Sequence, residues 1–194
     1  NTVVIFWMQT RQPSTASLAG SLLLAHPAMQ DPNFRRAVVL LSAHDDEGAL
    51  GVVLNRPMDK CLGELDDSLD ISNIGDVPIY AGGPVQTDRL LICGISIHED
   101  GEGLRLHFGI EPDKVEDLMA EYGDQVEVRA FMGHSGWGAG QLETELGKNT
   151  WAVSEIPGDL LYRDPDESMW RGVISMVSPE WRLLAEAPDD PERN

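Results

Sequence analysis

The residues best able to do chemistry stand in one glycine-rich segment, Gly133-His134-Ser135-Gly136-Trp137. A serine beside a histidine on a turn between a strand and a helix is typical of hydrolases with a serine nucleophile. Their turn has the pattern G-x-S-x-G, and here Trp137 occupies the second glycine position. An adjacent histidine cannot easily fold back onto the serine, so the base would be another imidazole, such as His44 or His26. A metal-independent hydrolase is therefore one hypothesis, and glycines that shape a tight turn are the other.

The same glycines could instead present backbone N–H groups to an anion at the start of a helix. Residues 136–140 read G-x-G-x-G, which is neither the dinucleotide fingerprint nor a P-loop, and no lysine follows them. Gly82-Gly83-Pro84 is a second glycine turn of the same kind. Neither segment carries a specific ligand motif, so we predict no cofactor.

A metal site would need several ligands brought close together. Among the histidines there is no i, i+4 pair and no H-x-H, although His44-Asp45-Asp46 and His98-Glu99-Asp100 place carboxylates beside an imidazole. Both groups fall on predicted hairpin turns, where solvated polar residues are expected. We therefore predict no metal site. The five histidines are His26, His44, His98, His107 and His134.

The charge of the chain restricts its partners. Its 194 residues include 14 Lys and Arg against 33 Asp and Glu, a net charge of −19. Phosphate backbones and anionic membranes are bound through basic side chains, and the nearest basic group, Arg35-Arg36, is two residues long. We expect no direct contact with nucleic acid or membrane. Asn55-Arg56 ends an apolar run, where Arg56 is expected to pair with a structural aspartate.

The cysteines and the N-terminal residues bear on localisation. Cys61 and Cys93 form no C-x-x-C pair, which favours free thiols in a reducing compartment. The apolar run Val3 to Met8 is too short to span a bilayer, and no basic residue precedes it. We therefore expect a cytoplasmic protein without a signal peptide or anchor.

The elements that must position these groups alternate between short strands and isolated helices. The clearest feature is a hairpin whose arms, 37–43 and 49–54, are apolar at nearly every position, which places it at the centre of a sheet. We expect further strands at 20–26, 78–81, 90–97, 104–108, 126–132, 151–154 and 160–162. We expect helices at 60–67, 112–122, 138–146 and after Asp164, the predicted N-cap of a helix that buries Met169, Trp170, Val173, Ile174 and Val177.

Hairpins interrupted by isolated helices, without regular βαβ alternation, favour the α+β class. The length fits one domain, and no repeat or linker is visible. We predict a flexible N-terminal extension at 1–16, one domain at 17–183 and an acidic C-terminal tail at 184–194.

Taken in order, several motifs resemble the YqgE/AlgH family of bacterial proteins, over about 18–181. The resemblance implies a coiled, mixed, largely antiparallel sheet flanked by helices, and no established activity. One branch of the family is labelled a transcriptional regulator, without a DNA-binding motif. The family usually has an aromatic residue and then Ala or Ser where this chain has His134-Ser135, a poor place for a nucleophile. The motifs are Gly20–Pro27 with Met29, Asp31–Arg36, His44–Gly51 running to Asn55-Arg56-Pro57, Gly82–Val85, Gly136–Glu143, Trp151 and Trp170.

The sequence thus favours a non-catalytic interaction or regulatory protein over the hydrolase. Its partner is expected to be another protein, through which any effect on transcription would pass. Glycine-rich loops and polar strand ends would form the binding surface. The candidate residues of this predicted patch are His44, Asp45, Asn55, Arg56, Gly82, Gly83, Ser135, Trp137 and Gln141.

Overall fold

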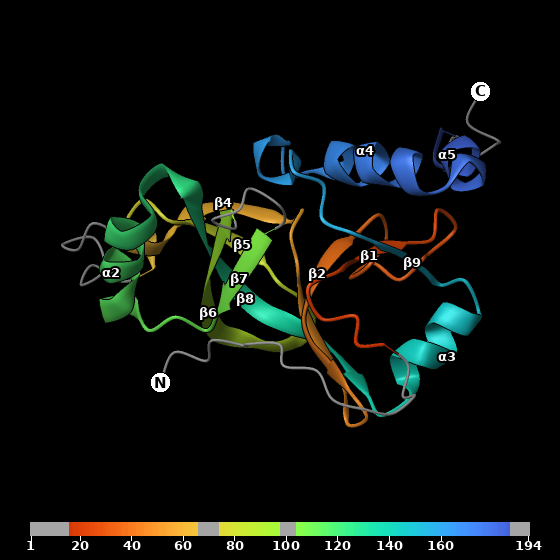
Figure 1. Cartoon of the computed structure of the whole chain (residues 1–194), viewed down its shortest axis with the longest axis horizontal. Coiled ribbons are helices and arrows are strands. Elements are labelled where there is room, and N and C mark those ends of the chain that lie inside the picture. The colour runs from red at the N-terminus through yellow and green to blue at the C-terminus, as the bar shows by residue number, and fades with distance from the viewer. Residues whose placement is uncertain (1–15, 66–73, 98–103, 187–194) are drawn as a thin grey trace.

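A single curved sheet organises the molecule in a computed structural model that describes residues 16–65, 74–97 and 104–186 (Figure 1). Helices α4 and α5 lie along one side of the sheet, α3 lies at its lower right corner and α2 at its left end. The α+β class and the mixed, coiled sheet predicted from the sequence are confirmed. The predicted N-terminal extension lies, apart from residue 16, outside the described residues.

The strands are β1 (Leu22–Ala25), β2 (Val38–Asp45), β3 (Gly48–Val53), β4 (Pro57–Cys61), β5 (Pro78–Ala81), β6 (Val85–Ile97), β7 (Leu104–Phe108), β8 (Val126–Gly138) and β9 (Trp151–Ser154). The α-helices are α2 (Pro112–Tyr122), α3 (Gln141–Gly147), α4 (Glu167–Val177) and α5 (Pro179–Glu186), with 3-10 helices at Leu62–Glu64, Gly123–Gln125 and Leu160–Tyr162.

The sheet has its apolar hairpin at the centre, as its residue pattern predicts. The strand order is β4-β5-β8-β3-β2-β1-β9, and β6 pairs with both β8 and β7. All pairs are antiparallel except β5 with β8. The hairpin arms reach Asp45 and restart at Gly48, so its turn is tighter than the predicted polar segment 44–48.

Both faces of the sheet are covered, which explains the apolar arms. One core lies under α4 and α5 and includes Trp170 and Phe131, and a second lies on the opposite face, where Leu142 of α3 packs. A third core joins α2 to the far end of the sheet through Val115. Alternate residues therefore point into different cores; Leu22 and Leu24 face the first, and Leu23 faces the second.

Several predicted elements are wrong in their ends or in their type. β8 continues to Gly138, so the glycine-rich segment expected as a loop is strand for most of its length. The helix expected at 60–67 is a strand end followed by the 3-10 helix Leu62–Glu64, and residues 66–73 lie outside the described chain. The strand expected at 160–162 is a 3-10 helix as well.

Helix α4 starts two residues later than predicted. Its N-cap is Asp166, whose Oδ1 accepts the Ser168 N–H at 2.7 Å, and hydrogen bonding by Ser168 lowers the pKa of this carboxyl. Met169, Trp170, Val173 and Ile174 are buried as expected, but Val177 is 36% exposed. A further helix, α5, follows and takes in residues 184–186, which the sequence had suggested belong to the tail.

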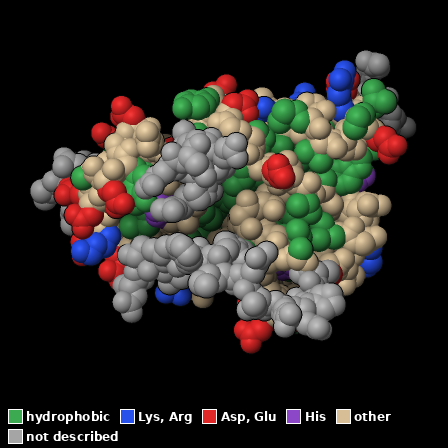
Figure 2. Space-filling view, in the orientation of Figure 1, with side chains coloured by type: hydrophobic (Ala, Val, Ile, Leu, Met, Phe, Trp, Pro, Cys, Tyr) green, Lys and Arg blue, Asp and Glu red, His purple; other side chains and the backbone are tan. Residues whose placement is uncertain are grey.

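On the face shown in Figure 2, acidic side chains outnumber basic ones, and hydrophobic side chains gather around α4 and α5 and below them. None of the described helices is both long enough and apolar enough to cross a membrane.

Candidate functional site

Ser135 is built into the sheet. It is 0% exposed, and its hydroxyl donates a hydrogen bond of 3.1 Å to the carbonyl oxygen of Gly82. The hydrolase hypothesis required an open Ser135 whose hydroxyl meets an imidazole at roughly 3 Å. The serine instead satisfies a backbone acceptor inside the protein, so the hypothesis is wrong for this residue.

The two glycine segments meet, but as packed backbone. Gly82 donates its N–H to Met132 and accepts from Val53 N–H at 2.9 Å each. At Gly83, φ is +149°, and a side chain there would overlap the backbone of His134. Glycine is therefore required for the close approach of this segment to β8. Gly82 and Gly83 thus act as scaffold against residues 133–135, while Pro84, Gly136 and residues 138–141 are exposed.

His44 lies beneath α3 and ties three segments together. Its imidazole side chain is 4% exposed, and Nε2 lies 2.7 Å from a carboxylate oxygen of Glu143. Nδ1 accepts the Leu18 N–H at 3.0 Å, which leaves Nε2 as the protonated nitrogen of the neutral ring. The Ser17 hydroxyl donates to the His44 carbonyl oxygen at 2.8 Å. His44 thereby fastens residues 17–18 to the hairpin and to α3.

Trp137 points inward, into an aromatic cluster. It is 6% exposed and its ring centroid lies 6.2 Å from that of Phe34 and 5.9 Å from that of Trp151. One carboxylate oxygen of Glu145 accepts both indole N–H groups, at 2.9 Å from Trp137 and 2.7 Å from Trp151. The other accepts the Gln141 amide at 2.9 Å. Glu145 was missed from the sequence because its partners lie eight and six residues away and share no local pattern.

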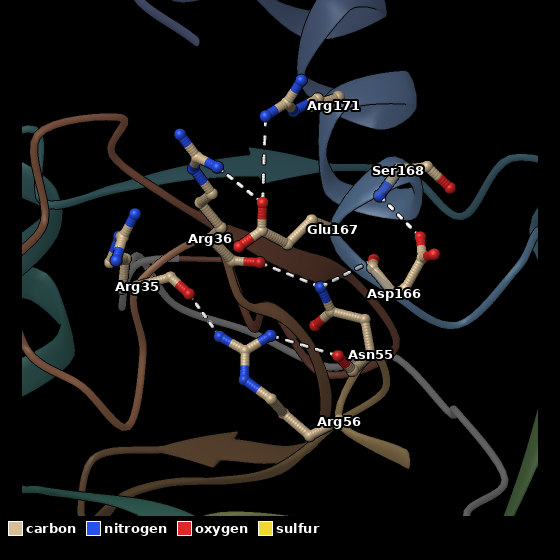
Figure 3. A network of polar contacts seen from close by, with 8 residues as sticks. All are labelled: Arg35, Arg36, Asn55, Arg56, Asp166, Glu167, Ser168 and Arg171. Carbon is tan, nitrogen blue, oxygen red and sulfur yellow. Dashed lines mark hydrogen bonds and ion pairs between the residues drawn. The ribbon is translucent and has the colours of Figure 1, made fainter. Parts of the chain in front are cut away.

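Asn55 joins the end of β3 to the starts of β2 and α4 (Figure 3). It is 2% exposed; its Oδ1 accepts the Val38 N–H at 2.9 Å, and its Nδ2 donates to the carbonyls of Arg36 at 2.9 Å and Asp166 at 3.1 Å. All three of these hydrogen bonds go to backbone groups of distant segments. This side chain is a structural joint.

Arg56 extends the same network toward residues 31–36. Its guanidinium donates to the carbonyl oxygens of Asn55, at 3.1 Å, and of Arg35. Partial burial lowers its pKa; the charge of Glu167 opposes this and the charge of Arg35 adds to it. The expected bond to an aspartate is not among the bonds of Arg56 in the described chain, where backbone carbonyls take that place.

Arg36 completes the joint from the other side. It adopts φ +54° and holds Glu167 of α4 at 2.5 Å, with its guanidinium 5.8 Å from the Trp170 ring centroid. Arg171 approaches the same carboxylate at 3.8 Å. Figure 3 shows these side chains converging on Glu167 at the beginning of α4. Charge pairing, cation–π contact and helix capping thus fix the α4 N-terminus to the sheet.

The remaining reactive groups form no catalytic or metal constellation in the part of the chain that is described. Burial raises the pKa of the Cys93 thiol to about 12, which keeps it protonated. The Ser96 hydroxyl lies 3.0 Å from His107 Nε2, but Ser96 is 0% exposed. No group of three or more His, Cys, Asp and Glu among the described residues could hold a metal ion. The predicted cluster His98-Glu99-Asp100 lies outside them.

The predicted patch therefore divides into an inner and an outer part. His44, Asn55, Gly82, Ser135 and Trp137 are buried, Gly83 and Arg56 are partly exposed, and Asp45 and Gln141 are exposed. The outer residues share one end of the sheet, because Gly48 of the hairpin pairs with Gly138, whose N–H bonds Gln141. The patch as an interaction surface stays a prediction.

Fold and polar groups together define a single-domain α+β protein whose conspicuous polar side chains hold segments of the chain together. The AlgH-like family model matches residues 22–182, so this chain belongs to that family. A UPF0301 protein of Streptomyces coelicolor is 40% identical over 92% of this chain and 96% of its own length. A UPF0301 protein of Pseudoalteromonas translucida is 35% identical over 83% and 91%.

Two solved structures share the fold. The solution structure of AlgH from Pseudomonas aeruginosa superposes with a TM-score of 0.62 at 29% identity, covering 93% of this chain and 100% of that one. The crystal structure of a Corynebacterium diphtheriae protein gives 0.65 at 20% identity over 93% and 95%. The resemblance stated from the sequence motifs is confirmed, and with it a bacterial family of uncharacterised proteins.

Proposed function

We propose that this chain is a non-catalytic interaction protein that works in the cytoplasm by binding another protein. Any effect on gene regulation passes through that partner. The proposal is supported by the inward use of Ser135, His44 and Asn55, which leaves them to stabilise the fold. A binding role needs exposed contact area, and the described chain offers it at the C-terminal helices.

Exposed apolar side chains on these helices carry the proposal. Leu183 is 70% exposed, Met176 is 56% and Leu184 is 53%, and all three lie on α4 or α5. Hydrophobic side chains gather around these helices in Figure 2. In a chain with a net charge of −19, grouped large apolar side chains favour a partner surface over plain solvation.

The charge defines what the partner must carry. A basic protein surface would be drawn to this chain, whereas nucleic acid would be repelled. Asp45, an exposed member of the predicted patch, lies at the hairpin tip beside the exposed Asp46 and Glu47, and these carboxylates would contribute acidic contacts there. Gln141, the other exposed member, begins α3 and would contribute a neutral amide. Apolar contacts at α5 then supply most of the affinity, and the acids supply steering.

The test is capture followed by reconstitution. The tagged chain is used to isolate partners from a lysate of its own source organism, and the dominant partner is purified and titrated against the chain by calorimetry. Leu183→Asp with Leu184→Asp is expected to weaken binding at least about tenfold, since two apolar contacts of this size are lost.

Met58→Asp with Met119→Asp is the matched control, because these methionines are 41% and 39% exposed and the double change introduces the same two negative charges away from α5. Equal binding by the α5 double variant and this control would remove the α5 surface from the proposal. Failure to isolate any stoichiometric partner would remove the proposal itself.

A further inference from the structure

The described sheet has three edges, and they differ in how well they are protected against pairing. β4 contains Pro57, Lys60 and Asp59 at φ +53°, and its register with β5 shifts. β7, with the sequence Leu-Arg-Leu-His-Phe, is not purely apolar. Proline, charge and irregular register are the features by which natural sheets prevent an edge from accepting another strand.

β9 has none of these features. Its sequence is Trp-Ala-Val-Ser, without proline or charge, and among the described strands it pairs with β1 alone. Its register with β1 is regular from Ala25↔Trp151 to Leu22↔Ser154. An apolar and regular edge is open to an added strand.

The hydrogen-bond pattern shows which groups face outward. The His26 N–H bonds the Thr150 carbonyl at 3.0 Å, so residue 150 and every second residue after it point their backbone groups to β1. Trp151 and Val153 therefore direct their N–H and C=O groups away from β1. Val153 is 37% exposed, whereas Trp151 is 4% exposed.

Both faces beside this edge already carry apolar side chains. Ala152 packs on the core under α4 and α5, and Trp151 packs on the core under α3. Trp181 of α5 contacts the ring of His26 at 4.5 Å, next to the start of β9. An added strand would thus find apolar neighbours above and below it.

We infer that β9 is the docking edge for an extended segment of a basic partner protein, which adds to the sheet as a further antiparallel or parallel strand. This inference rests on the proposed protein-binding function and names its site. Charge selects the occupant: a second copy would bring another net charge of −19 to the edge, whereas basic residues would meet the exposed Glu155 that follows β9.

The probe is a capped seven-residue peptide of alternating lysine and valine, titrated into the 15N-labelled chain. We expect the largest amide shift changes at Trp151 and Val153. The same peptide with every backbone nitrogen methylated keeps its charge but donates no backbone hydrogen bond, and should bind at least about tenfold more weakly.

Variants of the chain test the edge itself. Val153→Pro removes an outward N–H that β1 does not use, and Val153→Thr keeps it as the matched control. Val153→Lys places a charge on the same edge and is informative if the proline variant does not fold. Met58→Lys puts that charge on β4, where Met58 is 41% exposed. Only the Pro and Lys changes at position 153 should weaken peptide binding, by about tenfold.

Three results would overturn the inference. They are equal affinity of the methylated peptide, amide shifts confined to β4 or β7, and a wild-type dimer in sedimentation that Val153→Lys dissolves. A captured partner that binds Val153→Lys as tightly as wild type also removes the β9 edge but leaves the proposed function standing. If no partner is captured, the proposed function is wrong. Whether β9 accepts an added strand is then decided by the peptide titration alone.

Discussion

Single buried polar side chains in this chain hydrogen-bond to backbone groups of distant segments. Asn55 accepts the Val38 N–H, and Ser135 donates to the Gly82 carbonyl. A buried polar group without a partner costs about 1 to 3 kcal/mol, so each of these side chains has a structural reason to be present. At the residue scale, their roles can be separated from catalysis by measuring stability.

Ser135→Ala is expected to lower the free energy of unfolding by about 1 kcal/mol, because one buried hydrogen bond is lost. The loss stays small because the Gly82 carbonyl keeps its bond from the Val53 N–H at 2.9 Å. Urea unfolding followed by tryptophan fluorescence measures it. A fluorophosphonate probe should leave wild-type Ser135 unlabelled; stoichiometric labelling would contradict the structural role.

Glu143 makes stability depend on pH in the acid range. Its own backbone amide and then its hydrogen bond with His44 lower the pKa of this carboxyl in the folded state. A lowered folded pKa means that stability is present above the ordinary value, about 4.3, and is lost as the pH falls through the lowered value. Acidification should therefore destabilise wild type more than Glu143→Gln, which keeps an acceptor for His44 but no charge. Parallel unfolding curves for the two proteins between pH 6 and pH 3 would contradict this account.

At the scale of elements, the joint around Asn55 holds β2, β3 and α4 in register. Asn55→Ala leaves the Val38 N–H and the Arg36 and Asp166 carbonyls without this partner and is expected to lower the free energy of unfolding by about 3 kcal/mol. Asn33→Ala on the exposed turn is the control and should change it by less than about 0.5 kcal/mol. The urea midpoints of the two variants measure this difference in stability, and similar midpoints would show that the joint contributes little.

The hairpin turn depends on glycine at one position. Gly48 adopts φ +140°, and a Cβ there would overlap the Trp137 carbonyl on β8. Gly48→Ala is therefore expected to destabilise by about 3 kcal/mol, from backbone strain and a displaced strand. Gly147→Ala at the end of α3 meets open space and should be neutral or stabilise by up to about 1 kcal/mol. Thermal melts of both variants test the contrast, and an equal loss in both would contradict it.

Elements were predictable from the sequence where local pattern and tertiary context agree. The apolar hairpin arms gave the centre of the sheet, and the spacing in α2 gave its bounds, Pro112–Tyr122. The pattern failed at Gly133–Gly138, which is strand; Gly133, a residue type that normally marks a loop, is needed there because a Cβ would overlap the Gly83 carbonyl. The predicted N-cap Asp164 was wrong as well, because the side chain that accepts the Ser168 N–H belongs to Asp166, two residues further on.

Across the whole molecule, the family and the fold class could be predicted and the roles of the polar residues could not. The order of motifs along the chain identifies the family and the fold class, because it can be read without knowing any contact. The roles of the polar residues depend on pairs that are distant in sequence, such as His44 with Glu143 or Arg36 with Glu167. No residue pattern in one chain marks which polar side chains turn inward, so Trp137 looked like a surface residue and is core.

Net charge gives a prediction for the molecule as a whole. At −19 near neutral pH, self-repulsion destabilises the compact state, and salt screens it because the Debye length falls from about 30 Å at 0.01 M to about 8 Å at 0.15 M. Relief of about 1 kcal/mol would raise the melting temperature by about 3 °C for a chain of this size. Calorimetry at pH 7 in sodium chloride and in choline chloride should give the same rise, since screening depends on ionic strength alone. Near the isoelectric point, about 4.4, the rise should vanish because the net charge does. A fall with salt at pH 7 would mean that ion pairs such as Arg36 with Glu167 outweigh the repulsion among the acids.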